Sequence, residues 1–181
     1  MRFSLPAVAA GGLVAVAALT VADIATSQAE RRLDDAAILS ALEFTHGTEI
    51  ELSELALQKG SSQELKDMAT SFGAAHKAGK EEVKALGDKL DLKVGLNDDD
   101  PMKASAKENK DRLSALEGKA FDKAWVDHQV LFHQNALESV KSMIPTATNE
   151  EVKALLNKTQ TSVQGHLEAA KGLQNKIVAA Q

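Results

Sequence analysis

The chain has 181 residues, a formal net charge of −5 at pH 7 and no cysteine. Without cysteine, disulfides, thiolate metal sites, iron–sulfur clusters and cysteine nucleophiles are excluded. Acidic and basic residues are interspersed, with no basic block that would follow a phosphate backbone, so we expect no nucleic-acid partner. Aromatic residues make up only 3% of the chain, and alanine, leucine, lysine and glutamate dominate, which predicts an all-α protein.

Residues 1–29 are predicted to be a signal peptide. An uncharged run covers residues 5–22, and the small residues Ser27 and Ala29 fit a signal-peptidase site with cleavage after Ala29. The run is also about long enough to span a bilayer, so a retained N-terminal anchor is the alternative. In both cases we expect residues 30–181 to form one exported domain, periplasmic or associated with the envelope through the N-terminal segment. The sequence indicates no particular protein partner.

A first helix is predicted from about Asp35 to Lys59. Asp34 or Asp35 is expected to cap its start, and Gly60 to end it. Glu49 falls in a slot of the apolar stripe, where an aliphatic residue would be expected. The stripe itself consists of Ile38, Leu42, Leu52 and Ala56.

A second helix is predicted to begin at a capping box formed by Ser61 and Glu64 and to end near Leu92. His76 interrupts its apolar stripe in the same way as Glu49 interrupts the first. The stripe consists of Leu65, Met68, Ala69, Phe72, Gly79, Val83, Leu86 and Leu90.

The next segment is predicted to cross over the other helices. Asp100 can cap a helix and Pro101 fits its first position, so a polar helix is expected over residues 102–117. One continuous helix from Pro101 to Ile144 would be about 65 Å long, against about 40–45 Å for its neighbours. We therefore expect a break at Gly118.

The third and fourth long helices each carry a histidine in the apolar stripe. His133 lies in the third, over residues 121–144, and His166 lies in the fourth, which is expected to start at a capping box of Thr148 and Glu151. No segment shows the alternation of a strand. Four long helices with a long connection after the second predict a ferritin-like four-helix bundle whose crossover contains a short helix.

The four interrupting residues are predicted to converge. Glu49, His76, His133 and His166 each lie within about 40° of the middle of their apolar arc and within about 4 Å of their helix midpoint. Buried imidazoles and carboxylates need partners. Three histidines and one glutamate suit a Zn, Fe or Cu ion as cofactor. A closed hydrogen-bond network is the alternative, and a haem held by two of the histidines is disfavoured for lack of small residues beside it.

Two further histidines are predicted to stay outside this layer. Glu43 and His46 have the Glu-x-x-His spacing of di-iron bundles, but Glu43 points outward and the chain has no second such pair. His128 is expected at the rim. The sequence has no phosphate loop, no G-x-S-x-G and no H-E-x-x-H. We therefore expect a metal-binding module, or a purely structural or interaction bundle, rather than an enzyme.

The chain resembles a domain-of-unknown-function family of exported bacterial ferritin-like helical proteins, often labelled "predicted outer membrane protein". The pieces that carry the resemblance are Glu49 to Leu52 with Leu55 and Ala56, Phe72 with His76, Gly118 to Asp122 with Trp125 and His133, and His166 and Leu167 with Ala169 and Ala170. Two positions depart from the family pattern, Ala75 where the family has aspartate and Thr161 where it often has proline. The resemblance implies the fold and export, and no established activity.

Overall fold

The structure, a computed structural model, describes residues 21–179, with side chains from residue 35 onward, so the predicted signal peptide lies outside the described side chains. Five helices follow one another: α1 (Val21–Lys59), α2 (Gln63–Lys89), α3 (Pro101–Ser114), α4 (Gly118–Met143) and α5 (Glu150–Ala179). No strand occurs over residues 21–179. The all-α class is as predicted.

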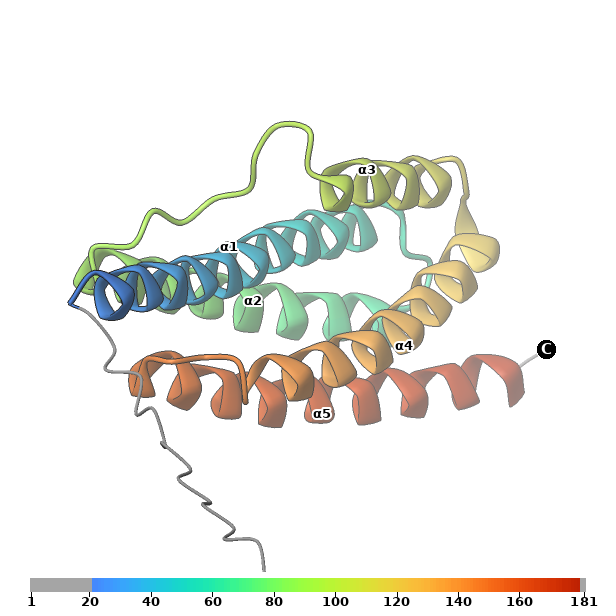
Figure 1. The fold of residues 1–181 in the computed structure, drawn as a ribbon. Helices are drawn as coiled ribbons and strands as arrows, with labels where there is room; N and C mark the ends of the chain where they lie inside the picture. Colours follow the sequence, from blue (N-terminus) through green and yellow to red (C-terminus); the bar gives the residue numbers. More distant parts are fainter. Residues whose placement is uncertain (1–20, 180–181) are drawn as a thin grey trace, which may run out of the picture.

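Two helical hairpins make up the bundle (Figure 1). Helix α1 packs mainly on α2, and α4 packs mainly on α5, while α2 contacts α5 and α1 contacts α4. The connection after α2 runs back along α1, and α3 then lies over α1 and leads into α4. This is the predicted bundle with a long crossover.

The crossover forms at the residues that the sequence indicates. The Asp100 side chain accepts a hydrogen bond of 2.9 Å from the backbone N–H of Met102, and Pro101 is the first residue of α3. The helix ends at Ser114, and α4 begins at Gly118, whose φ is +57°. Glycine adopts this left-handed conformation without the steric cost that a Cβ brings. The break between α3 and α4 is therefore confirmed.

A polar layer lies between two apolar clusters. One cluster surrounds Trp125 and takes apolar residues from one end of each long helix. The other surrounds Leu39 and takes apolar residues from the opposite end. Trp125 is fully buried and donates from Nε1 to the Leu52 carbonyl at 3.0 Å. Between the clusters lie Glu49 and His133, both fully buried. Apolar packing on both sides therefore fixes the height of this layer.

Each hairpin caps the turn of the other through a buried aspartate. Asp122 of α4 accepts hydrogen bonds from the backbone N–H groups of Ser61 and Ser62, at 2.8 and 2.9 Å. Asp35 of α1 likewise accepts from the backbone N–H groups of Thr148 and Asn149, at 2.9 and 3.0 Å. Carboxylates that accept from a helix start satisfy its free N–H groups.

These contacts correct two predicted capping boxes. The predicted box of Ser61 and Glu64 is wrong, because Ser62 precedes α2 and the Ser61 hydroxyl donates to Asp122 at 2.8 Å. The second box, of Thr148 and Glu151, is also wrong. Asn149 caps α5 by accepting from the Glu151 N–H at 2.8 Å, and the Thr148 hydroxyl donates to Asp35.

Helix α1 begins at Val21, so the prediction that Asp34 or Asp35 caps its start is wrong. Residues 21–34 contain no glycine or proline that would interrupt a helix. The predicted cleavage point after Ala29 falls inside α1, and cleavage stays a prediction. Among the residues that the structure describes, no helix combines the length and the apolar character that crossing a membrane requires.

Candidate metal centre

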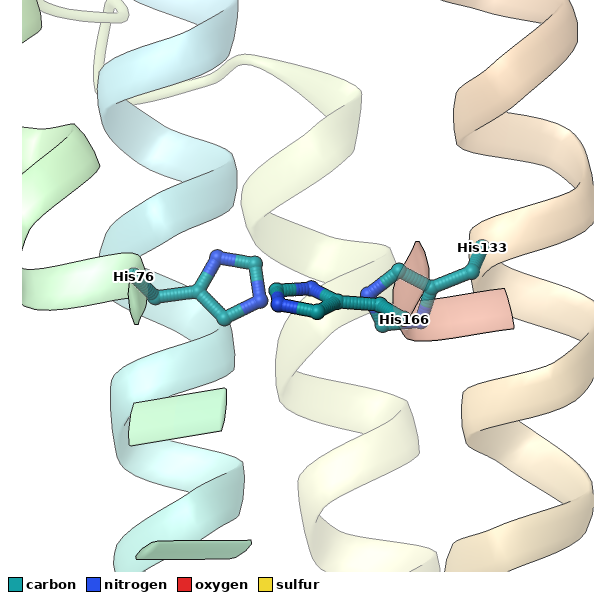
Figure 2. Close-up of side chains that lie close together, drawn as sticks. All are labelled: His76, His133 and His166. Atoms are coloured by element: carbon teal, nitrogen blue, oxygen red, sulfur yellow. The ribbon is translucent and has the colours of Figure 1, made fainter. Parts of the chain in front are cut away.

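Three histidines from three helices meet in the polar layer (Figure 2). His76 comes from α2, His133 from α4 and His166 from α5, and their rings point toward one another. One ring nitrogen from each lies within 4.8 Å of those of the other two. His133 is fully buried, His76 is 5% exposed and His166 is partly buried. The three histidines of the predicted set therefore lie close enough to share one ligand.

The hydrogen bond that His133 makes determines which of its nitrogens carries the proton. Its Nδ1 lies 2.9 Å from the backbone carbonyl oxygen of Gln129, one turn earlier in α4. Because a carbonyl oxygen only accepts, Nδ1 donates, and the neutral ring then carries its lone pair on Nε2. This Nε2 is buried without a hydrogen-bond partner among the described residues. Metal-ligating histidines are held by the same kind of bond from their other nitrogen.

His46 of α1 also joins the cluster, so the prediction that it stays outside the polar layer is wrong. Its Nδ1 lies 3.0 Å from Nδ1 of His76, so one of the two rings donates to the other. When His76 donates, its lone pair is on Nε2, an atom that has no hydrogen-bond partner in the described part of the chain. A Cβ at Gly79 would lie 2.6 Å from Cε1 of His46, so glycine makes room for the ring. The glycine at position 79, in the middle of the apolar stripe of α2, was the one sequence signal that a ring from another helix packs there.

His166 is held by stacking. Its ring lies on Phe72 with 4.2 Å between centroids and 25° between planes, and its centroid is 5.2 Å from that of His133. Its buried Nδ1 lacks a hydrogen-bond partner within residues 35–179. Each of the three histidines thus has one buried ring nitrogen without a partner, and such a group costs about 1–3 kcal/mol. A bound cation would satisfy all three.

Glu49 supplies a buried carboxylate at the same level. Its Oε2 accepts from Nε2 of Gln129 at 2.9 Å, and its Oε1 lies 3.8 Å from Nε2 of His128. Burial by itself raises the pKa of Glu49, but the neighbouring imidazoles, His128 first among them, outweigh burial and hold the pKa below its ordinary value. Glu49 is not part of the group within 4.8 Å. It therefore acts on the histidines through its charge.

Burial keeps the clustered histidines neutral. It lowers the pKa of His76 to about 3 and that of His166 to about 4, while the charge of Glu49 opposes it in both rings. Burial also lowers the pKa of His46 and that of His133. At neutral pH these rings are therefore in the unprotonated form that binds metal ions.

The spacing of the three rings fits a transition metal after a small closure. Metal–nitrogen bonds of about 2.0–2.1 Å place the ligating nitrogens about 3.3–3.6 Å apart. The nitrogens now lie within 4.8 Å of one another, so ring rotations that move each atom by about 1 Å would suffice. Imidazole ligands suit Zn, Cu and Fe, whereas Ca²⁺ and Mg²⁺ take oxygen ligands.

The remaining predicted groups behave differently from one another. Glu43 pairs with Lys80 at 3.0 Å, so it is directed away from the three histidines, as expected. The His128 side chain is only 9% exposed and faces Glu49, so the predicted rim position is wrong. Helical phase considers α4 alone and does not show that α1 packs against the side of α4 that carries His128. Gln129, one turn before His133, was the missed partner of Glu49.

Two cavities reach the cluster. The first, of about 230 Å³, is lined by His46, His76 and His166 and by Glu82 and Lys158, which form an exposed ion pair of 2.7 Å. The second, of about 210 Å³, is lined by His46, His76 and His133, by apolar side chains and by two methionines. Small solutes therefore have space beside the histidines on more than one side.

The chain belongs to the family described as "Domain of unknown function (DUF4142)", whose profile matches residues 20–173. No curated protein matches it. Solved structures with the same fold include a DUF305 fragment from Deinococcus radiodurans, at 14% identity and a TM-score of 0.71 over 79% of this chain and 96% of that one. A DUF305 protein from Streptomyces coelicolor, described as a presumed secreted protein, has 15% identity and a TM-score of 0.68. The match covers 80% of this chain and 93% of that one. CopM in its Cu(I)-bound form has 19% identity and a TM-score of 0.63 over 78% and 96%. At these identities the likeness concerns the fold alone.

Proposed function

We propose that this member of the DUF4142 family is an exported four-helix bundle that binds a transition metal ion through His76, His133 and His166. Glu49 supplies the nearby negative charge. The observation that carries the proposal is the orientation of His133, whose Nδ1 donates to the Gln129 carbonyl and whose Nε2 is buried without a partner among the described residues. A buried lone pair held in this way beside two other imidazoles is suited to a cation.

The donor set limits the ion. Three neutral imidazoles and a neighbouring carboxylate favour Zn, Fe or Cu. CopM, which shares the fold, is known in Cu(I)-, Cu(II)- and Ag-bound forms. This likeness supports a transition metal as the ligand class, and no ligand residue is carried over from CopM.

Export is part of the same proposal. The uncharged N-terminal run and the small residues before position 30 support a signal peptide, with residues 30–181 as the exported domain. A neighbour described as a presumed secreted protein agrees with this. The mass of the protein from a periplasmic extract tests it, because cleavage removes residues 1–29 and a retained anchor keeps them.

A structural bundle without metal is the second candidate. The observation that favours it is the hydrogen bond of 3.0 Å between the partly buried His46 and the buried His76, since these two rings already satisfy one another. In that case the histidines hold the helices together, and Glu49 serves only as the acceptor for Gln129. The unpaired nitrogens of His133 and His166 oppose this candidate, because pairing within the layer leaves them unsatisfied in the described residues.

Metal content decides between the two. We expect protein purified without a histidine tag to carry or take up about one equivalent of a transition metal by plasma mass spectrometry. His133→Ala and His166→Ala should each remove this binding. Gln164→Ala is the control on the same helix as His166, because Gln164 is exposed and donates to Glu168 rather than to the histidines. Less than about a tenth of an equivalent, together with no thermal shift on adding Zn²⁺, Cu²⁺ or Fe²⁺, would refute the metal site.

A further inference from the structure

The cavity of about 210 Å³ beside His46, His76 and His133 is also lined by Met102 of α3 and Met143 of α4. Methionine is scarce in this chain, with four residues in 181. Only Met68, Met102 and Met143 have described side chains, and Met68 instead packs against the apolar cluster around Trp125. Two of the three therefore lie in one cavity that leads to the histidines.

Exposure decreases along this cavity from the methionines to the histidines. Met102 is 38% exposed and Met143 is partly buried, whereas His76 is 5% exposed and His133 is fully buried. The cavity therefore connects the surface of the crossover with the interior of the bundle. A cation that enters from the crossover, past Met102, meets thioether sulfur first and imidazole nitrogen afterwards.

The remaining lining selects against hydrated divalent ions. Apart from the histidines, it consists of apolar side chains and the hydroxyls of Thr45, Ser139 and Thr159, with no carboxylate among the described lining residues. A hydrated divalent ion would lose water ligands there without gaining a negatively charged oxygen. Thioether and imidazole are the ligands that a soft monovalent cation such as Cu(I) prefers. The other cavity differs, because the ion pair of Glu82 and Lys158 lines it.

We propose that this cavity is the uptake route for Cu(I) or Ag(I), which Met102 and Met143 bind on the way to the three histidines. The inference rests on the proposed metal site and adds its preferred ion and its direction of loading. No electron is transferred in this scheme. The cation exchanges one set of neutral ligands for another, and its charge is balanced at the end of the route by the carboxylate of Glu49.

The test compares loading rates in two methionine variants of the full-length protein. Cu(I) is delivered from a coloured chelator and its transfer is followed by the loss of the chelator complex, while the uptake of Ag(I) and the affinity for Zn²⁺ are measured by calorimetry. The double substitution Met102→Leu and Met143→Leu keeps side-chain volume and apolar character but removes both sulfur atoms. Met68→Leu is the matched control, because Met68 lies away from the cavity. Circular dichroism checks that each variant keeps the parental fold.

We expect the double variant to take up Cu(I) and Ag(I) at least about fivefold more slowly, and to keep the Zn²⁺ affinity of the parent. The control should match the parent for all three ions. Cu(I) loading at the parental rate in the double variant, or equal losses for all ions, would refute the route while leaving the metal site standing. A parent that binds none of the three ions and no Fe²⁺ would refute the proposed function and the route together.

Discussion

The substitution His133→Leu is expected to stabilise the metal-free protein and to abolish its metal binding. His133 is fully buried between two apolar clusters, and leucine has a similar volume and no polar atom. The variant loses one hydrogen bond, from Nδ1 to the Gln129 carbonyl, and it loses the buried Nε2 that has no partner among the described residues. A metal site and a structural histidine predict opposite signs for this change.

The expected magnitude follows from these terms. Losing the bond to Gln129 costs about 1 kcal/mol, and removing the unsatisfied Nε2 returns about 1–3 kcal/mol. Burying the aliphatic side chain of leucine contributes about 1–2 kcal/mol more. The net gain in the free energy of unfolding is about 2 kcal/mol, which raises the Tm by about 4–8 °C in a chain of this length.

Thermal unfolding followed by circular dichroism, with and without metal, measures both effects. With a chelator present, the variant should melt above the parent. With metal at about 100 times its Kd, the parent gains about 2.7 kcal/mol and the variant gains nothing, so the order of the two Tm values should reverse. A metal-free variant that melts below the parent by more than about 3 °C would refute the reasoning, since His133 would then hold the bundle together.

Three further predictions concern the surroundings of the site. Burial lowers the pKa of His76 to about 3, whereas the same ring titrates near 6.5 in the unfolded chain. Below pH 6.5 the unfolded chain therefore binds a proton that the folded chain does not, and at pH 5.5 this should lower the free energy of unfolding by about 1.4 kcal/mol. Urea unfolding measures the loss, and a denaturation midpoint that does not change with pH would contradict the burial of His76. Asp122→Ala removes the acceptor that caps the start of α2 and should lower the free energy of unfolding by about 2–3 kcal/mol; a loss below about 0.5 kcal/mol would show that water replaces it. Gly79→Ala places a Cβ 2.6 Å from the ring of His46 and should weaken metal binding about tenfold. Gly172→Ala is the control, because no atom lies within 4 Å of the added Cβ, and it should leave the metal affinity unchanged. Equal affinities in the two glycine variants would argue against a role for His46.

The sequence predicted the three histidines of the site because helical phase and height are local quantities. His76, His133 and His166 each interrupt an apolar stripe near the middle of a helix, and bundles of similar helices align their midpoints. Their convergence within 4.8 Å needs no knowledge of which helix lies beside which. Whether a metal binds there stays a prediction.

The contacts at the edges of the site could not be predicted in this way. Helical phase places Glu49 and His128 with an error of tens of degrees, and it does not say which neighbour covers each arc. The pairing of His46 with His76 and of Gln129 with Glu49 depends on the packing of α1 against α2 and α4. The caps could not be predicted for the same reason, since they also depend on tertiary packing. Asp122 and Asp35 accept hydrogen bonds from the backbone N–H groups of Ser61 and Thr148, which lie more than 60 positions away in the sequence.

The sequence by itself determined an all-α bundle, the break before α4, the core stripes and the height of the polar layer. Each of these follows from the period of the helix, from the restricted φ of proline and from the freedom of glycine, which act within a few residues. Only the tertiary structure decided which polar atoms find partners. Nε2 of His133 is left with a free lone pair because its own helix takes Nδ1 and no N–H or O–H of the described neighbours donates to Nε2.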